Sequence, residues 1–274
     1  MGPKAGPEPE PQAGIEIYPV PKDGFLQDPR RPLGVRIAQL QTGRMVAPHA
    51  HPRGQLTLVY DGVVRLRVGE DVWFVPGKHG IWIPPDMPHQ LSGQRNVEIH
   101  HLFVDPRFVA RLGWSQPEVV VGSPLLRGIA RRLAPGAVET LSHAEARRLA
   151  WVALDEMGRL DRPDLRLPGG RDARLLAAME RLLDAPGEIG GLEDLARKSG
   201  TSSRTLARLF SEETGLSFRD WRARAVFMQA LERLEMGESS TALAAYLGYS
   251  SASAFVAAFR RHFGAPPSAY RRGG

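Results

Sequence analysis

The sequence predicts a multidomain protein in which an all-β domain is followed by a helical connector and an all-α domain. Apolar residues alternate with period two from about residue 25 to residue 104, as in strands with one buried face. After Pro106 they recur with the spacing of amphipathic helices. A Pro- and Gly-rich linker at 161–170 precedes the C-terminal helices. The expected division is a tail at 1–20, a β domain at 21–106, a connector at 107–168 and a helical domain at 169–274.

Composition narrows the class of protein. The first fourteen residues are rich in Pro, Gly and Glu, which predicts a disordered tail without the apolar core of an export signal. No apolar run approaches the roughly 18 residues that span a membrane, so no membrane partner and a cytoplasmic location are expected. The absence of cysteine excludes disulfides and thiolate metal sites. The net charge of +6 permits nucleic acid as a partner but does not select it.

The β domain is expected to consist of short strands joined by tight turns. Val64, Leu66 and Val68 alternate with two arginines, as in a strand with one buried face. Asp61-Gly62 lies between this run and LTLVY, and it predicts a hairpin because glycine tolerates a positive φ. Several short strands at regular spacing predict a sandwich or a barrel, and the motifs below favour the barrel.

Helices are expected from the connector onward. The segments 123–134 and 142–159 have amphipathic spacing. A long helix is expected from Ser217 to Met236, opened by a capping box at Ser217 and Asp220. Together these segments predict a chain that is helical throughout its second half.

Two segments of the C-terminal domain repeat a helix–turn–helix pattern. In the first, 192–215, apolar stripes flank Gly200, and in the second, 241–264, they flank Gly248. A single helical hairpin of this kind most often only packs within its domain and does not bind DNA. Two of them joined by a helix can place two recognition helices in successive major grooves, about 34 Å apart. This arrangement favours double-stranded DNA as a partner.

The segment 248–272 closely resembles the C-terminal signature of AraC-type (AraC/XylS family) transcriptional regulators. The matching residues are Gly248, Tyr249, Phe255, Phe259, Arg260, Arg261, Gly264, Pro267, Tyr270 and Arg271. The first hairpin also matches, in Leu195, Ala196, Ser199, Gly200, Leu206, Phe210 and Gly215. The resemblance implies that the second helix of each hairpin reads bases.

In the first hairpin, the positions that match the family's base readers include Arg204 and Arg208, with Thr205 beside them. Arg204 and Arg208 are four residues apart and therefore share one helix face. Arginine can grip guanine with two hydrogen bonds. The alternative is that both are ordinary surface arginines.

In the second hairpin, the expected DNA contacts are weaker. Ser251 and Ser253 offer hydroxyl groups next to apolar neighbours, which suits thymine methyl groups or DNA shape. Arg260 and Arg261 lie late in the helix and are expected to contact phosphates. We therefore expect the first hairpin to supply most of the direct readout.

The stretch PHAHPRGQL, 48–56, places His49 and His51 on one side of a strand, because residues two apart point the same way. A third histidine, His89, follows a proline-rich turn. This arrangement resembles the cupin family of β barrels. Its first motif is met by Gly43, His49, His51, Gln55 and Gly62, and its second by Pro84 and His89, with Asp86 in place of a glycine.

Gln55 stands where the cupin motif has a carboxylate ligand. Three imidazoles and an amide are all neutral, so they leave the charge of a divalent ion uncompensated. Three histidines alone can nevertheless hold Zn, Ni, Cu or Fe. His49, His51, Gln55 and His89 are therefore expected either to hold a metal or to line an organic effector pocket. Three further histidines could add to either site, and only one of the last two can face inward: His79, His100 and His101.

A cupin domain ahead of an AraC-type domain implies a transcription regulator without enzymatic activity, whose cupin domain senses a small molecule or a metal ion. The alternative is a metal-dependent cupin enzyme with a DNA-binding appendage, against which the missing carboxylate argues, and no catalytic residue is assigned. A third reading is a nonspecific DNA binder with strong salt dependence. The sequence leaves open the effector, the operator, activation or repression, and whether the chain forms a homodimer.

Overall fold

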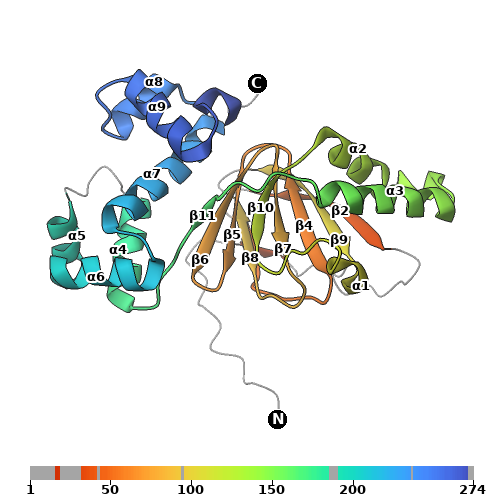
Figure 1. The fold of residues 1–274 in the computed structure, drawn as a ribbon, viewed down its shortest axis with the longest axis horizontal. Coiled ribbons are helices and arrows are strands. Elements are labelled where there is room, and N and C mark those ends of the chain that lie inside the picture. The colour runs from red at the N-terminus through yellow and green to blue at the C-terminus, as the bar shows by residue number, and fades with distance from the viewer. Residues whose placement is uncertain are drawn as a thin grey trace, which may run out of the picture.

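The computed structural model describes residues 16–18, 32–41, 44–93, 96–184, 191–235 and 237–270. Of the tail expected at 1–20, all but Glu16–Tyr18 lies outside the described residues, and these three form strand β1. Figure 1 shows a central β domain, with helices α2 (Pro124–Arg132) and α3 (His143–Met157) on one side and the C-terminal helices on the other. The expected order of β domain, connector and helical domain is confirmed.

The β domain consists of two sheets. Their strand orders are β1-β3-β8-β5-β6-β11 and β10-β7-β4-β9-β2. Among the described pairs, only β1 with β3 is parallel. The strand bounds are β2 Leu33–Leu40, β3 Arg44–Val46, β4 Gly54–Val59, β5 Val63–Val68, β6 Asp71–Pro76, β7 His79–Ile83, β8 Gln90–Gly93, β9 Val97–Val104, β10 Glu118–Val121 and β11 Arg166–Leu167.

The hairpin expected at Asp61-Gly62 is wrong, because β4 and β5 belong to different sheets and do not pair with each other. The turn carries the chain from one sheet to the other. Gly62 has φ 70°, a left-handed conformation that an L side chain would strain, and its carbonyl accepts from the Gly77 amide at 2.8 Å. The next reversal, with Gly69 at φ 56°, joins β5 to β6, and these two strands do pair antiparallel. The glycine signal therefore marks a reversal of the chain but does not determine which strands pair.

Alternation along β4 gives the strand two different faces. Leu56 and Leu58 belong to an apolar cluster with residues of α2 and α3, whereas Val59 belongs to the main core of the β domain. Gln55 and Thr57 share the face of Val59 because residues two apart point the same way. Both polar side chains are almost completely buried, so each needs a hydrogen-bond partner inside the domain.

The connector is less purely helical than its sequence pattern predicts. Strand β10 pairs antiparallel with β7, and β11, inside the stretch expected as a linker, pairs antiparallel with β6. Both strands are short and lie at the edges of the sheets. The unpaired N–H and C=O groups of an edge strand can form hydrogen bonds with a neighbouring segment whatever its side-chain pattern. The two expected helices are present as α2 and α3, and α3 opens with a capping box between Ser142 and Glu145. A one-turn helix α1, Pro106–Val109, precedes them.

The C-terminal domain contains both expected helix–turn–helix units. Gly200 at φ 67° and Gly248 at φ 74° turn the chain between the helices of each unit. The long helix that joins the units begins one residue later than expected and is described as far as Glu235, since Met236 lies outside the described residues. The bounds are α4 Ala173–Asp184, α5 Leu192–Lys198, α6 Ser203–Thr214, α7 Phe218–Glu235, α8 Ser240–Tyr246, α9 Ala252–Phe263 and the 3-10 helix η4 Pro267–Tyr270. None of the described helices is long and apolar enough to cross a membrane.

Helix α7 packs against the β domain as well as within its own domain. The Trp221 indole donates to the Pro168 carbonyl at 2.7 Å, and Arg224 forms an ion pair with Asp164 at 2.7 Å. At the end of the chain, the Tyr270 ring stacks on His79 of β7, with ring centroids 5.6 Å apart and planes 10° from parallel. The two domains therefore share an interface formed by α7, η4 and the linker.

Candidate functional site

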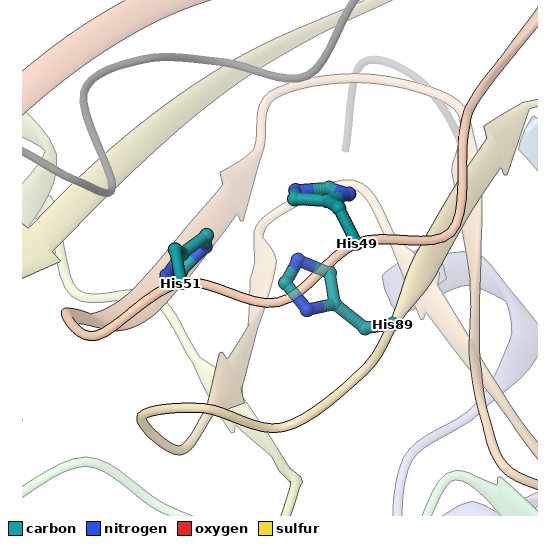
Figure 2. Close-up of side chains that lie close together, drawn as sticks. All are labelled: His49, His51 and His89. Carbon is teal, nitrogen blue, oxygen red and sulfur yellow. The ribbon is translucent and has the colours of Figure 1, made fainter. Parts of the chain in front are cut away.

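The three histidines expected to act together do lie together. An isolated bridge joins His49 to His89, with the His49 amide donating to the His89 carbonyl at 3.0 Å and the reverse bond at 2.9 Å. The ring centroids lie 4.3 Å apart for His49 and His89, 5.2 Å for His51 and His89, and 5.7 Å for His49 and His51. Figure 2 shows His49 and His51 on one segment and His89 beside them on another.

Backbone carbonyls fix the orientation of all three rings. The Nδ1 atoms of His49, His51 and His89 lie 2.8, 2.7 and 2.8 Å from the carbonyls of Ala47, Arg53 and Met87. A carbonyl only accepts, so each Nδ1 carries a proton and donates it. In a neutral ring Nε2 then carries the lone pair, which is the form that binds a metal ion.

Burial favours the neutral form of His49 and His89. Desolvation lowers the pKa of His89 to about 3 and also lowers the pKa of His49. The Nε2 atoms of His49 and His89 are buried and have no hydrogen-bond partner among the described residues. Such orphaned acceptors are costly unless a ligand satisfies them. One ligand atom from each histidine lies within 4.8 Å of the others, and this donor set fits a divalent metal ion.

Gln55, the fourth residue expected here, contacts His51. Its Oε1 lies 2.9 Å from His51 Nε2, and its Nε2 donates to Thr57 Oγ1 at 2.8 Å. Thr57 Oγ1 in turn lies 2.9 Å from His101 Nδ1. These four side chains form a continuous buried chain of polar contacts from the histidine cluster into β9. Thr57 and His101 were not recognised as a unit in the sequence, although Gln55 and Thr57 share the parity of His51 along the chain.

The other two histidines, His79 and His100, lie outside the cluster. His100 is also buried but lies on the opposite face of β9, where its ring lies 4.1 Å from that of Tyr60 and its Nε2 donates to Glu98 at 3.0 Å. His79 lies at the domain interface against Tyr270. The expectation that only one of His100 and His101 faces inward is confirmed, and the inward one is His101.

A cavity of about 450 Å³ opens next to the histidine cluster, between β6, β10 and the linker strand β11. Met87 lines it, and the Met87 carbonyl accepts from His89, so the cavity and the cluster share one loop. Two ion pairs belong to its lining, Arg162 with Glu118 at 3.0 Å and Arg166 with Asp71 at 3.4 Å. The cavity is therefore large enough for an organic molecule but does not include the three histidines.

In the first helix–turn–helix unit the candidate DNA-contacting residues lie along α6. Arg204 is exposed and has no ion pair within the described part of the chain, whereas Arg208 is paired with Glu212 one turn later. Thr205 is half-buried, and its amide donates to the capping hydroxyl of Ser202 at 3.1 Å. Arg204 and Arg208 therefore present two guanidinium groups on one exposed face, while Thr205 lies near the start of the helix.

In the second unit the candidate residues border an open groove of about 770 Å³ along α9. Ser253, Arg260 and Arg261 line it together with small apolar residues. Ser251 caps the helix, accepting from the Ala254 amide at 3.1 Å. Ser251, Ser253 and both arginines are exposed. This surface has small side chains at the N-terminal half of the helix and positive charge at the C-terminal half.

Comparisons with known proteins cover both domains. The model of the AraC-like ligand binding domain matches residues 33–199, and that of a helix-turn-helix domain matches residues 195–273. The HTH-type transcriptional regulator NimR of Escherichia coli strain K12 is 32% identical over 233 residues, covering 84% of each chain. The HTH-type transcriptional regulator RipA of Corynebacterium glutamicum is 38% identical over 107 residues, covering 39% of this chain and 32% of that one.

Among solved structures, ToxT from Vibrio cholerae covers 88% of this chain and 98% of its own, at 12% identity and a TM-score of 0.35. We draw no conclusion from a likeness of this size. The two family models and the relative that spans most of both chains are the informative matches.

Proposed function

The chain belongs to the family of AraC-type, DNA-binding transcriptional regulators with an N-terminal ligand-binding domain, and from this we propose that His49, His51 and His89 form its effector site. The single observation that carries this proposal is the convergence of three neutral imidazoles, each held by a backbone carbonyl so that Nε2 is directed into the cluster. Apolar side chains would stabilise this buried position better than imidazoles with unsatisfied nitrogen atoms. A purely structural role therefore does not account for the cluster.

The ligand that this donor set favours is a divalent metal ion of the nitrogen-binding kind, such as Zn, Ni, Cu or Fe. Gln55 Oε1 lies near enough to His51 Nε2 to serve as a neutral fourth donor. No carboxylate belongs to the group, so the bound ion keeps its charge and attracts an anion from solution. A metal held by neutral ligands alone suits reversible binding better than permanent retention.

A second candidate is an organic effector that occupies the cavity next to the cluster. The cavity shares the Met87 loop with His89 and is closed by residues of the linker. A molecule with polar groups could lie there and contact the metal or the histidines through that loop. In either case, the effector acts on the interface between the domains by binding one arrangement of them more tightly than another.

The proposed DNA surface consists of α6 and α9. Arg204 and Arg208 would contact base edges, with Thr205 beside them, and Arg260 and Arg261 would contact phosphates. The short side chains of Ser251 and Ser253 would allow α9 to approach the groove closely. An enzymatic role is a weaker proposal, because no carboxylate lies in the histidine group to act as a general base.

The experiment that tests the effector site is metal analysis of the full chain, wild type beside the double variant His49→Ala, His51→Ala, before and after incubation with Zn²⁺. We expect about one ion per wild-type chain after incubation and essentially none in the double variant, because a single remaining imidazole does not hold a metal. The matched control is His143→Ala, which removes an exposed histidine of α3. Equal metal content in all three proteins would reject the site.

A further inference from the structure

The chain of side chains from His51 to His101 can carry hydrogen bonds in either direction. His51, Gln55, Thr57 and His101 are all buried, with Thr57 completely inaccessible to solvent. A hydroxyl donates one hydrogen bond and accepts others, and an amide has a donating end and an accepting end of similar shape. The direction is therefore set by the groups at the two ends of the chain.

The empty site fixes the direction at the His51 end. The Arg53 carbonyl, 2.7 Å from His51 Nδ1, takes the single ring proton of a neutral imidazole. Nε2 then holds a lone pair, which needs a donor. The NH₂ end of Gln55 must turn toward His51, its carbonyl must accept from the Thr57 hydroxyl, and Thr57 must accept from His101 Nδ1.

A cation on His51 Nε2 fixes the opposite direction. A metal ion there favours the Gln55 carbonyl, because Oε1, 2.9 Å from His51 Nε2, would then be a neutral ligand beside the imidazole. The Gln55 amide nitrogen then donates to Thr57 Oγ1, and the Thr57 hydroxyl donates to His101 Nδ1. His101 must in this case carry its own proton on Nε2.

We propose that Thr57 and His101 are positioning residues of the effector site, and that they form with Gln55 a relay whose hydrogen bonds reverse when a metal ion binds. The inference rests on the proposed metal-binding function of the histidine cluster. His101 can report the reversal because it is neutral: burial lowers its pKa to about 3, so it carries one ring proton whose position follows the Thr57 hydroxyl.

The relay gives a physical reason for an amide at position 55. A carboxylate can only accept, so it would repel the lone pair of His51 in an empty site and could not turn to satisfy it. Gln55 satisfies His51 with its NH₂ end when the site is empty and with its carbonyl when the site is loaded. Both states are then free of unpaired polar groups on this side of the cluster, which makes loading reversible, as a sensor requires.

The test is the position of the His101 ring proton, read from nitrogen-15 spectra of histidine-labelled full-length protein with and without Zn²⁺. The His101 signals are assigned by their loss in His101→Asn. In the wild type we expect the proton on Nδ1 without Zn²⁺ and on Nε2 with Zn²⁺, although His101 does not belong to the group of metal-binding histidines. Zn²⁺ affinity is measured on the same samples by competition with a chromophoric chelator.

Two kinds of variant separate the relay from general stability. Thr57→Val keeps the shape but removes the hydroxyl, so we expect no response of His101 to Zn²⁺ and about a tenfold loss of Zn²⁺ affinity, with rescue of both by Thr57→Ser. Gln55→Glu should bind Zn²⁺ more tightly, because it adds a charged ligand. Its relay cannot reverse, so the His101 proton should remain on Nδ1 in both states.

The outcomes are distinct. Zn²⁺ binding by the wild type without any change at His101 overturns the relay and leaves the metal site standing. A response of His101 in Thr57→Val or in Gln55→Glu equal to that in the wild type also overturns it. No binding of Zn²⁺ to the wild type overturns the metal site and the relay together.

Discussion

At the scale of single residues, the two arginines of α6 have different environments and therefore different predicted effects. Arg204 is exposed and has no ion pair among the described residues, so its guanidinium group can contact DNA without first breaking an ion pair. Arg208 must first leave Glu212, at a cost below about 1 kcal/mol for an exposed pair. We expect Arg204→Ala to weaken binding to the preferred duplex by about tenfold to a hundredfold, and Arg208→Ala by less.

This prediction is measured by fluorescence anisotropy at one fixed salt concentration, on a duplex selected from a random pool and on an unselected duplex. Arg147→Ala, on the exposed face of α3, removes the same charge away from the proposed DNA surface and should change neither affinity. Equal losses on both duplexes for Arg204→Ala would assign that residue to phosphate contact instead of base readout.

At the scale of elements, the cap of α6 links helix stability to DNA binding. Ser202 Oγ accepts from the Thr205 amide at 3.1 Å, and loss of such a cap costs about 1 kcal/mol. We expect Ser202→Ala to lower the thermal stability of the domain and Ser202→Asp to retain it, because aspartate also caps helices. The new carboxylate should nevertheless weaken DNA binding, since the start of α6 is proposed to lie in the DNA groove, where the phosphates repel a negative charge.

Thermal unfolding and anisotropy measured on the same samples separate the two effects. The matched control is Ser142→Asp, which places the same charge on the cap of α3, far along the chain from α6. If Ser202→Asp bound DNA as tightly as the wild type, the N-terminus of α6 would not lie against the DNA.

Elements with strong local signals could be predicted from the sequence, and those that depend on tertiary pairing could not. Both helix–turn–helix units follow from glycine positions and apolar spacing. The hairpin expected at Asp61-Gly62 was wrong, because a turn signal does not show whether the two strands that it joins share a sheet. Strands β10 and β11 are four and two residues long, too short to show a period, and they exist because an open sheet edge pairs with them.

The same distinction applies to the candidate site. His49 and His51 were expected on one side of a strand, but the structure places them between β3 and β4, with only an isolated bridge at His49. His89 was placed with them by a motif. The contact of Thr57 with His101 was not anticipated, because threonine is an ordinary strand residue and the contact requires the pairing of β4 with β9. Sequence alone could give the candidate ligands but not the residues proposed to orient them.

At the scale of the whole molecule, the domain interface contains a titratable contact. His79 of β7 stacks on Tyr270 of η4, and its pKa is lowered, mainly by burial and further by the neighbouring Arg127 and Lys78. The Gly77 carbonyl partly opposes this shift. Burial raises the pKa of Tyr270, so that ring stays neutral at mildly acidic pH. Among the described groups that face this stack, His79 is the one whose ordinary pKa lies in this range.

The sign of the effect follows from linkage. If the C-terminal domain separates from the β domain, the pKa of His79 returns to its ordinary value of 6.5. The separated (undocked) form therefore binds the proton more tightly than the docked form, in which His79 stacks on Tyr270. Docking is at full strength above that value and weakens as the pH falls below it. We therefore expect the linker at 163–168 to exchange its amide hydrogens faster at about pH 5.5 than at neutral pH, after correction for the intrinsic rate.

His79→Phe tests whether this contact governs the response, because phenylalanine keeps a stacked ring and cannot take a proton. Exchange of the linker in that variant should be slow and nearly independent of pH over the same range. The Arg127 bond to residue 79 goes to the backbone carbonyl, at 3.3 Å, and is retained in the variant. Faster linker exchange on acidification in both proteins would place the titrating group elsewhere. A response confined to the wild type would instead make docking of the DNA-binding domain a property that one buried histidine controls.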